Sequence, residues 1–157
     1  MSKWKYKGRT VHRRPKGKFG FIYVITHNQS GLKYIGMKQF HSTRRIKVAG
    51  KVRRKVVTKE SDWKTYNSSS KTLQDMIKTM GESEFSYEII CYADTKGQMT
   101  YLEENFQHKC DAILNDNFLN DSIGHRRYMS LKRTQSLFDS VENLKKWIFN
   151  YFVNLMD

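Results

Sequence analysis

The side chain best placed to do chemistry in this sequence is the carboxylate of Glu103. Apolar residues recur around it at helical spacing and predict a helix over residues 98–114. They are Met99, Leu102, Phe106, Cys110 and Ile113. Glu103 should point with this stripe toward the core, whereas Glu104 is turned about 100° toward solvent. A buried carboxylate is costly unless a cation or hydrogen bonds meet it, so Glu103 either serves a site or lies at the stripe's edge in a surface ion pair.

Two tyrosines, Tyr23 and Tyr34, lie in two apolar segments that predict neighbouring strands. Residues 19–25 and 33–37 have strand composition, and the turn-forming residues 27–31 between them predict a hairpin. A loop of residues 27–30 would put Tyr23 opposite Tyr34, and any loop of even length puts both phenols on one face of the sheet. The phenols are then either functional groups or core aromatics with hydrogen-bonded hydroxyls.

These residues belong to a longer pattern. Gly20-Phe21-Ile22-Tyr23 is followed by Tyr34-Ile35-Gly36, and the downstream segments are Ser61–Tyr66 with Ser68-Ser69, Tyr101-Leu102-Glu103 and Leu119-Asn120. Over residues 19–125 the pattern resembles the GIY-YIG nuclease family, in particular its phage-type subgroup related to homing endonucleases. The first triplet departs from that pattern, because it reads Phe-Ile-Tyr and its glycine stands one place earlier.

The resemblance implies cleavage of DNA phosphodiesters with one divalent metal, Mg²⁺ or Mn²⁺, on a core with a three-stranded antiparallel sheet. By position, Tyr23 and Tyr34 are the motif tyrosines, Gly36 is the glycine of close approach, Glu103 is the metal ligand and Asn120 is the late asparagine. Arg44, ten residues after Tyr34, is near the place of the family's catalytic arginine. That arginine stands on a helix in the family, whereas Arg44 opens a long basic stretch. Arg45 and Lys38 therefore compete with Arg44 for the phosphate.

The residue types suit this chemistry. Magnesium accepts one carboxylate and keeps several waters and a phosphate oxygen, so Glu103 alone can suffice as the protein ligand. An arginine fork grips non-bridging phosphate oxygens better than a lysine does. The resemblance implies that Tyr23 takes a proton from water and that Tyr34 orients water or phosphate. We expect Trp63 to pack in the core, with Tyr66 and Ser69 bracing the site or touching DNA.

Charge is distributed very unevenly along the 157 residues, which carry a net charge of +14. Residues 1–60 hold 18 basic side chains and one acid, a net of +17, whereas residues 61–157 hold 11 basic and 14 acidic, a net of −3. This asymmetry favours nucleic acid as a functional partner over a tail that only aids solubility or touches ribosomal RNA, and over an anionic membrane. The resemblance implies that this nucleic acid is double-stranded DNA. The candidate DNA-binding residues are Lys16, Lys18, Lys51, Arg53, Arg54, Lys55 and Lys71.

The elements that must position these residues predict an α+β fold. The expected order is two strands, a basic loop or flexible hairpin over residues 38–60, a helix over 73–80, a strand over 85–93 and the helix of Glu103, which gives a small, mostly antiparallel three-stranded sheet flanked by helices. Residues 1–18 form a basic arm, in which Trp4 and Tyr6 alternate with lysines. This arm either stacks on nucleic acid or is a flexible tail.

Residues 19–125 form the nuclease-like domain, and residues 126–157 form a helical extension. Apolar residues at helical spacing over 137–155 predict an amphipathic C-terminal helix, which packs on the domain or serves as a homodimer contact. The chain shows no membrane-length apolar run and no signal core, and its two cysteines make no disulfide framework. We therefore expect a cytoplasmic protein, in the host cytoplasm if it is phage-encoded.

No phosphate-binding glycine loop, zinc-ligand spacing or serine-nucleophile motif is present in the sequence. The sequence therefore predicts a metal-dependent DNA endonuclease of GIY-YIG type. The alternative is a DNA- or RNA-binding protein without catalysis, either a coating module or a degenerate member of the family.

Overall fold

A computed structural model describes residues 2–50, 52–124, 126–127 and 140–146 of the chain. Its centre is an antiparallel sheet of β3 (Gly20–His27), β4 (Lys33–Gln39) and β7 (Phe85–Ala93), with β3 in the middle. The short strands β1 (Lys5–Tyr6) and β2 (Arg9–Thr10) extend this sheet beyond β7 to the order β2-β1-β7-β3-β4. The α+β class is confirmed, but the sheet has five strands instead of three, and it is mixed because β1 runs parallel to β7.

The N-terminal segment is part of this folded unit. Trp4 is fully buried and packs edge-on against Phe21 and Tyr87, and its indole N–H donates to the carbonyl of Trp63. The interpretation that Trp4 stacks on nucleic acid is therefore wrong. Alternation of lysines with aromatic residues is also the pattern of a strand with one buried face, and β1 is such a strand, between β2 and β7.

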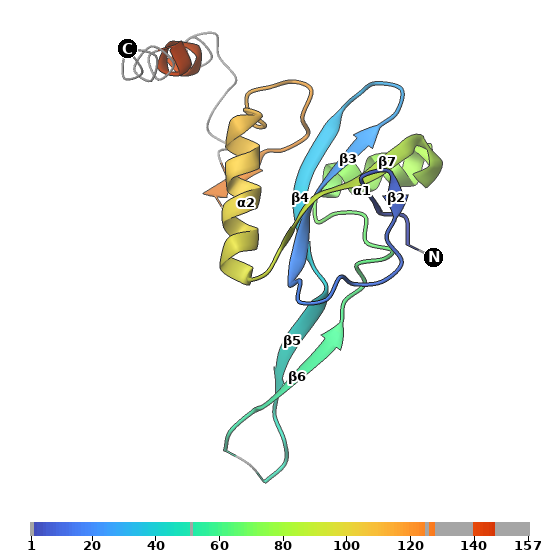
Figure 1. The fold of residues 1–157 in the computed structure, drawn as a ribbon, viewed down its shortest axis with the longest axis vertical. Coiled ribbons are helices and arrows are strands. Elements are labelled where there is room, and N and C mark those ends of the chain that lie inside the picture. Colours follow the sequence, from blue (N-terminus) through green and yellow to red (C-terminus); the bar gives the residue numbers. More distant parts are fainter. Residues whose placement is uncertain (1, 51, 125, 128–139, 147–157) are drawn as a thin grey trace.

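The two helices cover opposite faces of the sheet (Figure 1). Helix α1 (Lys71–Met80) is capped by Ser70, whose hydroxyl accepts from the Leu73 N–H, and it ends at Gly81, where φ is 98°. It packs through Leu73 and Ile77 on what we call the α1 side, together with Trp63, whose predicted core position is confirmed. A short 3₁₀ turn, η1 (Glu82–Glu84), leads from α1 into β7. Helix α2 (Lys96–Lys109) packs on the opposite α2 side through Met99, Leu102 and Phe106.

The β3–β4 hairpin places both motif tyrosines on the α1 side. Tyr23 pairs with Gly36 and Tyr34 pairs with Ile25, so the expected pairing of Tyr23 with Tyr34 is wrong. The last pair is Thr26 with Lys33, which leaves a loop of residues 27–32 instead of 27–30. Because both loops have even length, the prediction that the phenols share a face is confirmed. Their ring centroids are 6.4 Å apart.

The basic block between β4 and α1 forms a second hairpin that extends away from the main sheet (Figure 1). Strands β5 (His41–Ile46) and β6 (Lys55–Glu60) pair only with each other. Beyond α2, β8 (Ser122–Ile123) and β9 (Arg126–Arg127) form a short ladder. Residues 140–146 are helical, whereas the rest of the predicted 137–155 helix lies outside the described residues. Among the helices described, none is long and apolar enough to cross a membrane.

Candidate active site

Three tyrosines, the buried Tyr23 and the partly buried Tyr34 and Tyr66, form a cluster on the α1 side of the sheet. The ring of Tyr23 lies 6.4 Å from that of Tyr34 and 6.3 Å from that of Tyr66, which belongs to the segment between β6 and α1. The same segment supplies the hydroxyls of Ser68 and Ser69, which hydrogen-bond to the phenols. The β3–β7 ladder shifts register beside Tyr23, a local bulge of the kind that re-aims a side chain.

Burial decides the protonation of these phenols. It raises the pKa of Tyr23 well above the ordinary value of 10, and the neighbouring Tyr66 and Tyr34 raise it further. Burial also raises the pKa of Tyr34 and of Tyr66, although hydrogen bonds from serine side chains offset part of that effect. All three phenols are therefore neutral at physiological pH in the free protein, and their hydroxyls are available as hydrogen-bond donors.

Gly36 lies directly under the phenol of Tyr23. A Cβ atom at position 36 would come within 2.5 Å of the Tyr23 hydroxyl, 2.6 Å of its Cζ atom and 3.0 Å of the Tyr34 ring. Real Cβ atoms do not approach other heavy atoms that closely, so only glycine leaves room for both phenols at this point of the sheet. This close contact explains why the motif has glycine at position 36.

Glu103 is buried, as its place on the helical stripe predicts, with 8% of its surface exposed. Burial, with the charge of Glu104 second, raises its pKa from 4.5 to about 7, although a hydrogen bond from the backbone N–H of Met37 opposes this. Helix α2 packs on the opposite side of the sheet, but Glu103 meets the edge strand β4 at the Met37 N–H, and its charge contributes to the raised pKa of Tyr23, Tyr34 and Tyr66. The carboxylate is therefore within electrostatic range of the tyrosine cluster. Within the described part of the chain no lysine or arginine pairs with it, so the surface ion pair is excluded.

Lys38 is the basic side chain that the fold brings to the tyrosines. It follows Tyr34 and Gly36 by strand alternation on the α1 side, and its ammonium lies 3.5 Å from the centroid of the Tyr66 ring. It also donates to Asp62 Oδ1 at 2.6 Å, and this hydrogen bond is the largest cause of the lowered pKa of Asp62. Because Lys38 is largely buried and its carboxylate partner fixes its position, its ammonium stays beside the phenols.

The structure does not bring Arg44 or Arg45 to this cluster. Both stand exposed on β5, in the hairpin that leads away from the sheet. Arg44 follows Gly36 by eight positions, and eight steps of an extended chain span up to about 26 Å, which exceeds the reach of an arginine side chain. The expected contact of Arg44 with the same phosphate as the tyrosines is therefore not supported by the fold.

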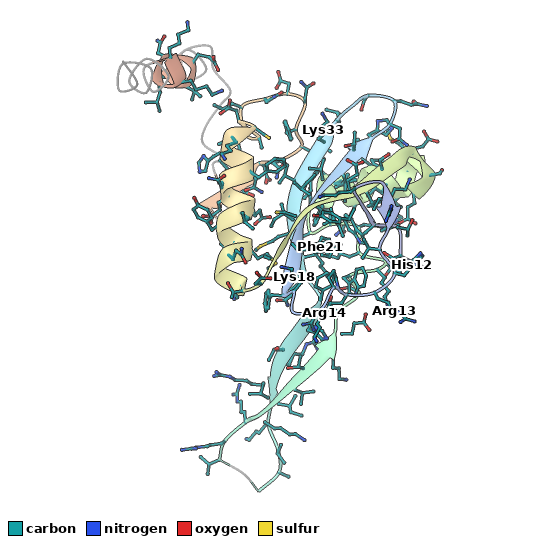
Figure 2. The ribbon with its side chains drawn as sticks, in the orientation of Figure 1. His12, Arg13, Arg14, Lys18, Phe21 and Lys33 are labelled. Atoms are coloured by element: carbon teal, nitrogen blue, oxygen red, sulfur yellow. The ribbon has the colours of Figure 1, made fainter. Side chains whose placement is uncertain are left out.

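The predicted DNA-binding residues are mostly exposed. Lys16, Arg53, Arg54, Lys55 and Lys71 lie open to solvent, whereas Lys51 is outside the described residues. Lys18 is half-buried and pairs with Asp94 at 2.7 Å. Figure 2 shows Arg13, Arg14 and Lys18 near the base of the β5–β6 hairpin, where they add to its positive charge.

Asn120 stabilises the edge strand that carries the motif. It is buried, its Oδ1 accepts from the N–H of Ile35 at 3.0 Å, and its Nδ2 donates to the Ile35 carbonyl at 2.9 Å. At Ile35, which lies between Tyr34 and Gly36, the Asn120 amide thus makes the two backbone hydrogen bonds that a neighbouring strand would otherwise make. Gln107, which sequence reasoning missed, contacts the same carbonyl at 3.4 Å and accepts from the Gly124 N–H. Its position four residues after Glu103 on the same helix face was the available signal.

A divalent cation at this site would have Glu103 as its one acidic protein ligand. No group of three or more His, Cys, Asp or Glu side chains able to hold a metal occurs within the described residues. A buried carboxylate without a cationic partner, next to polar hydroxyls, still fits a hard ion that keeps most of its waters and takes phosphate oxygens from a substrate. The donor set is therefore compatible with Mg²⁺ or Mn²⁺ and lacks the sulfur and imidazole ligands that zinc prefers.

Comparison with known families agrees with this geometry. A family model described as "Putative endonuclease segE, GIY-YIG domain" matches residues 4–123. The chain therefore belongs to the GIY-YIG family, in its SegE type. Its matched range includes both tyrosines, Lys38, Glu103 and Asn120, and it begins at the buried Trp4. Neither the curated proteins nor the solved structures contain a significant match to the chain.

Proposed function

We propose that this protein is a DNA endonuclease that hydrolyses phosphodiester bonds with the help of Mg²⁺ or Mn²⁺. Family membership supports the nuclease class. The observation that carries the finer proposal is the buried carboxylate of Glu103, which pairs with no lysine or arginine among the described residues and whose charge acts on a cluster of three phenols. A carboxylate with a pKa of about 7 is poorly stabilised by the protein alone, and a bound cation would favour its charged form.

Each side chain of the site has a defined task in this proposal. Glu103 holds the cation, which when bound supplies positive charge at the phosphate and lowers the pKa of nearby water. Tyr23, with the Ser68 hydroxyl beside it, would position the attacking water. Cationic charge next to the phenol would oppose the pKa rise caused by burial, so that the phenol first loses its proton to solvent and then, as a phenolate, takes one from the water. Tyr34 holds water or phosphate through its hydroxyl, and Asn120 keeps the strand of Tyr34 in place.

Lys38 takes the place that the family pattern gives to arginine. A substrate phosphate that reaches the tyrosines meets the Lys38 ammonium, which Asp62 holds in position. Removing one preorganised donor of this kind costs roughly 100-fold or more in turnover rate. We therefore expect Lys38→Ala to slow single-turnover cleavage by about that factor and Arg44→Gln to leave the cleavage step of bound DNA unchanged. The reverse order of effects would return the catalytic role to Arg44.

Nicking of supercoiled plasmid tests the function directly. Wild-type protein should nick DNA with Mg²⁺ or Mn²⁺ and stop when EDTA is added. Glu103→Gln should abolish nicking, whereas Glu104→Gln, on the next residue of the same helix and turned away from the site, is the matched control and should retain it. Nicking that persists in Glu103→Gln at the wild-type rate would refute the assigned role of this carboxylate.

The exposed position of Arg44 favours a second candidate, a DNA- or RNA-binding protein without catalysis. Such a protein would bind nucleic acid in a salt-dependent manner and leave plasmid intact with either metal. The plasmid-nicking assay therefore distinguishes an active enzyme from a binding protein. If cleavage occurs, sequencing the ends of the cleaved DNA identifies the target sequence and shows which strands are cut. A homing-type role in a phage, with action in the host cytoplasm, belongs to the first candidate.

A double-strand break requires more than one cleavage event, because a single site of this type cuts one strand at a time. We propose that two copies associate through the predicted amphipathic segment 137–155 when both strands are cut. Sedimentation velocity of the protein with and without duplex DNA tests this. A monomer under both conditions, together with double-strand cleavage, would contradict the dimer.

A further inference from the structure

The β5–β6 hairpin is exposed on both of its faces. It forms a sheet of its own, and most of its twelve residues are open to solvent, including the apolar side chains of Ile46 and Val56. An isolated two-stranded ribbon is marginally stable in water, so the hairpin depends on contacts at its base or with a partner.

The base of the hairpin is anchored in the core beside the tyrosines. Phe40, which joins β4 to β5, is fully buried against Phe21 and Trp63, at centroid distances of 5.2 and 5.1 Å. On the returning strand, Ser61 donates its N–H to the Phe40 carbonyl at 2.9 Å, and Glu60 accepts from the Trp63 indole at 2.9 Å. Because these contacts are buried and hydrogen-bonded, the direction of the hairpin is fixed relative to the active site.

One face of the β5–β6 hairpin continues the α1 side of the main sheet, and the other face continues the α2 side. Alternation along β4 and β5 puts Gly36, Lys38 and Phe40 on the α1 side with the tyrosines. The residues between them face the α2 side, where a cavity is lined by Gln39, His41, Thr43 and Thr58 of the two hairpins and by Arg14, Lys18, Phe19 and Lys96 from outside them. The Thr43 and Thr58 hydroxyls, 3.4 Å apart, confirm that these paired residues share that face. Ser42, Arg44 and Ile46 therefore continue the active-site face.

Charge distinguishes these two faces. Cross-strand pairing puts Lys59 opposite Ser42, Val57 opposite Arg44 and Lys55 opposite Ile46, so the active-site face carries three cations and no acid. On the other face Arg45 stands opposite Val56, and Glu60 stands opposite His41. Along the two strands, the positive charge is thus concentrated on the face that continues from the tyrosine cluster.

We propose that the active-site face of the β5–β6 hairpin docks into the major groove of the DNA duplex that the tyrosine site cuts, and that the opposite face points away from the DNA. The inference rests on the proposed nuclease function. The groove is about 12 Å wide and admits a two-stranded ribbon. Strands of six residues are about 20 Å long, which matches roughly six base pairs at 3.4 Å per step. Arg44 thus contacts a phosphate several base pairs from the cut and positions the DNA.

Two adjacent substitutions test which face meets DNA. Arg44→Gln and Arg45→Gln remove the same charge from neighbouring exposed residues of one strand, on opposite faces. Each lost phosphate contact lowers the slope of log K against log salt by about 0.9, which corresponds to about eightfold weaker binding at 0.1 M salt. We expect this loss for Arg44→Gln and a change below about twofold for Arg45→Gln. Lys55→Gln and Lys59→Gln should behave like Arg44→Gln.

Binding is measured by fluorescence anisotropy with a short labelled duplex in EDTA, so that no cleavage occurs, and hydroxyl-radical footprints locate the hairpin on the DNA. The wild-type footprint should extend about six base pairs to one side of the cut and shorten in Arg44→Gln. Equal losses in both variants, or a larger loss in Arg45→Gln, would overturn the proposal. If wild-type protein does not nick DNA but Arg44→Gln weakens binding more than Arg45→Gln, the nuclease function alone is refuted. If wild-type protein nicks DNA and the two variants bind equally, the docking face alone is refuted.

Discussion

The raised pKa of Glu103 predicts a specific dependence of stability on pH. The carboxyl ionises near pH 4.5 in an unfolded chain and near pH 7 in the folded protein, because burial disfavours the charged form. Between these values the folded chain retains a proton that the unfolded chain has lost, so stability falls as pH rises through this window. The difference of 2.5 between about 7 and 4.5, at 1.36 kcal/mol for each pH unit, gives a loss of about 3 kcal/mol above pH 7.

The substitution Glu103→Gln removes this titration and retains an oxygen that can accept from the Met37 N–H. Urea unfolding followed by fluorescence of the buried Trp4 and Trp63 should therefore show that the variant gains about 2.5 kcal/mol over wild type between pH 5 and pH 8, in EDTA, because a small part of the loss has already occurred at pH 5. Other groups titrate equally in both proteins and cancel. Glu104→Gln removes the second cause of the pKa rise, so its gain should have the same sign and be smaller.

Addition of Mg²⁺ extends the same experiment. A cation that binds the ionised carboxylate should restore part of the stability lost by wild type at pH 8 and have little effect at pH 5 or on Glu103→Gln. A stability difference between wild type and Glu103→Gln that is the same at both pH values would refute the reasoning. That result would mean that the carboxylate is solvated in the free protein.

Three further predictions concern the frame of the site. Gly36→Ala should cost about 1–3 kcal/mol and slow nicking, because the added methyl group displaces the Tyr23 phenol; unchanged unfolding and nicking rates would contradict this. Asn120→Ala should cost about 1–3 kcal/mol in urea unfolding, since it leaves the Ile35 N–H without a partner and leaves the Ile35 carbonyl only the longer bond from Gln107, and a cost below about 1 kcal/mol would show that water replaces the amide. Trp4→Ala should cost about 3–5 kcal/mol by the same measurement, whereas a flexible arm would tolerate the change.

Local periodicity accounts for what was predicted correctly. The period of two in a strand puts Tyr23 and Tyr34 on one face whatever the even length of the loop, so this prediction survived a wrong register. The helical period buries Glu103 and leaves Glu104 at the side, and Ser70 and Gly81 bound α1 through capping and a positive φ. These features depend on a few consecutive residues.

Long-range pairing accounts for what was missed. Strand β1 joins the sheet by parallel pairing of Lys5 with Glu88, more than eighty residues away, and no local pattern distinguishes such a short strand from a basic tail. Gln107 has an ordinary helix sequence around it, and only the fold brings its amide to the Ile35 carbonyl. Tertiary packing selects these partners after the local elements have formed.

The basic side chain next to the tyrosines shows most clearly what local sequence predicts and what long-range packing decides. From the sequence, Lys38, Arg44 and Arg45 are three members of one basic stretch, and charge and spacing cannot rank them. Strand alternation puts Lys38 on the side of the tyrosines, and the returning chain supplies Asp62 to hold it there. Residue types and periods thus determined the family, the shared face of the phenols and the buried carboxylate. Only the tertiary structure decided which basic side chain accompanies them, because that depends on how a hairpin of residues 41–60 leaves the core.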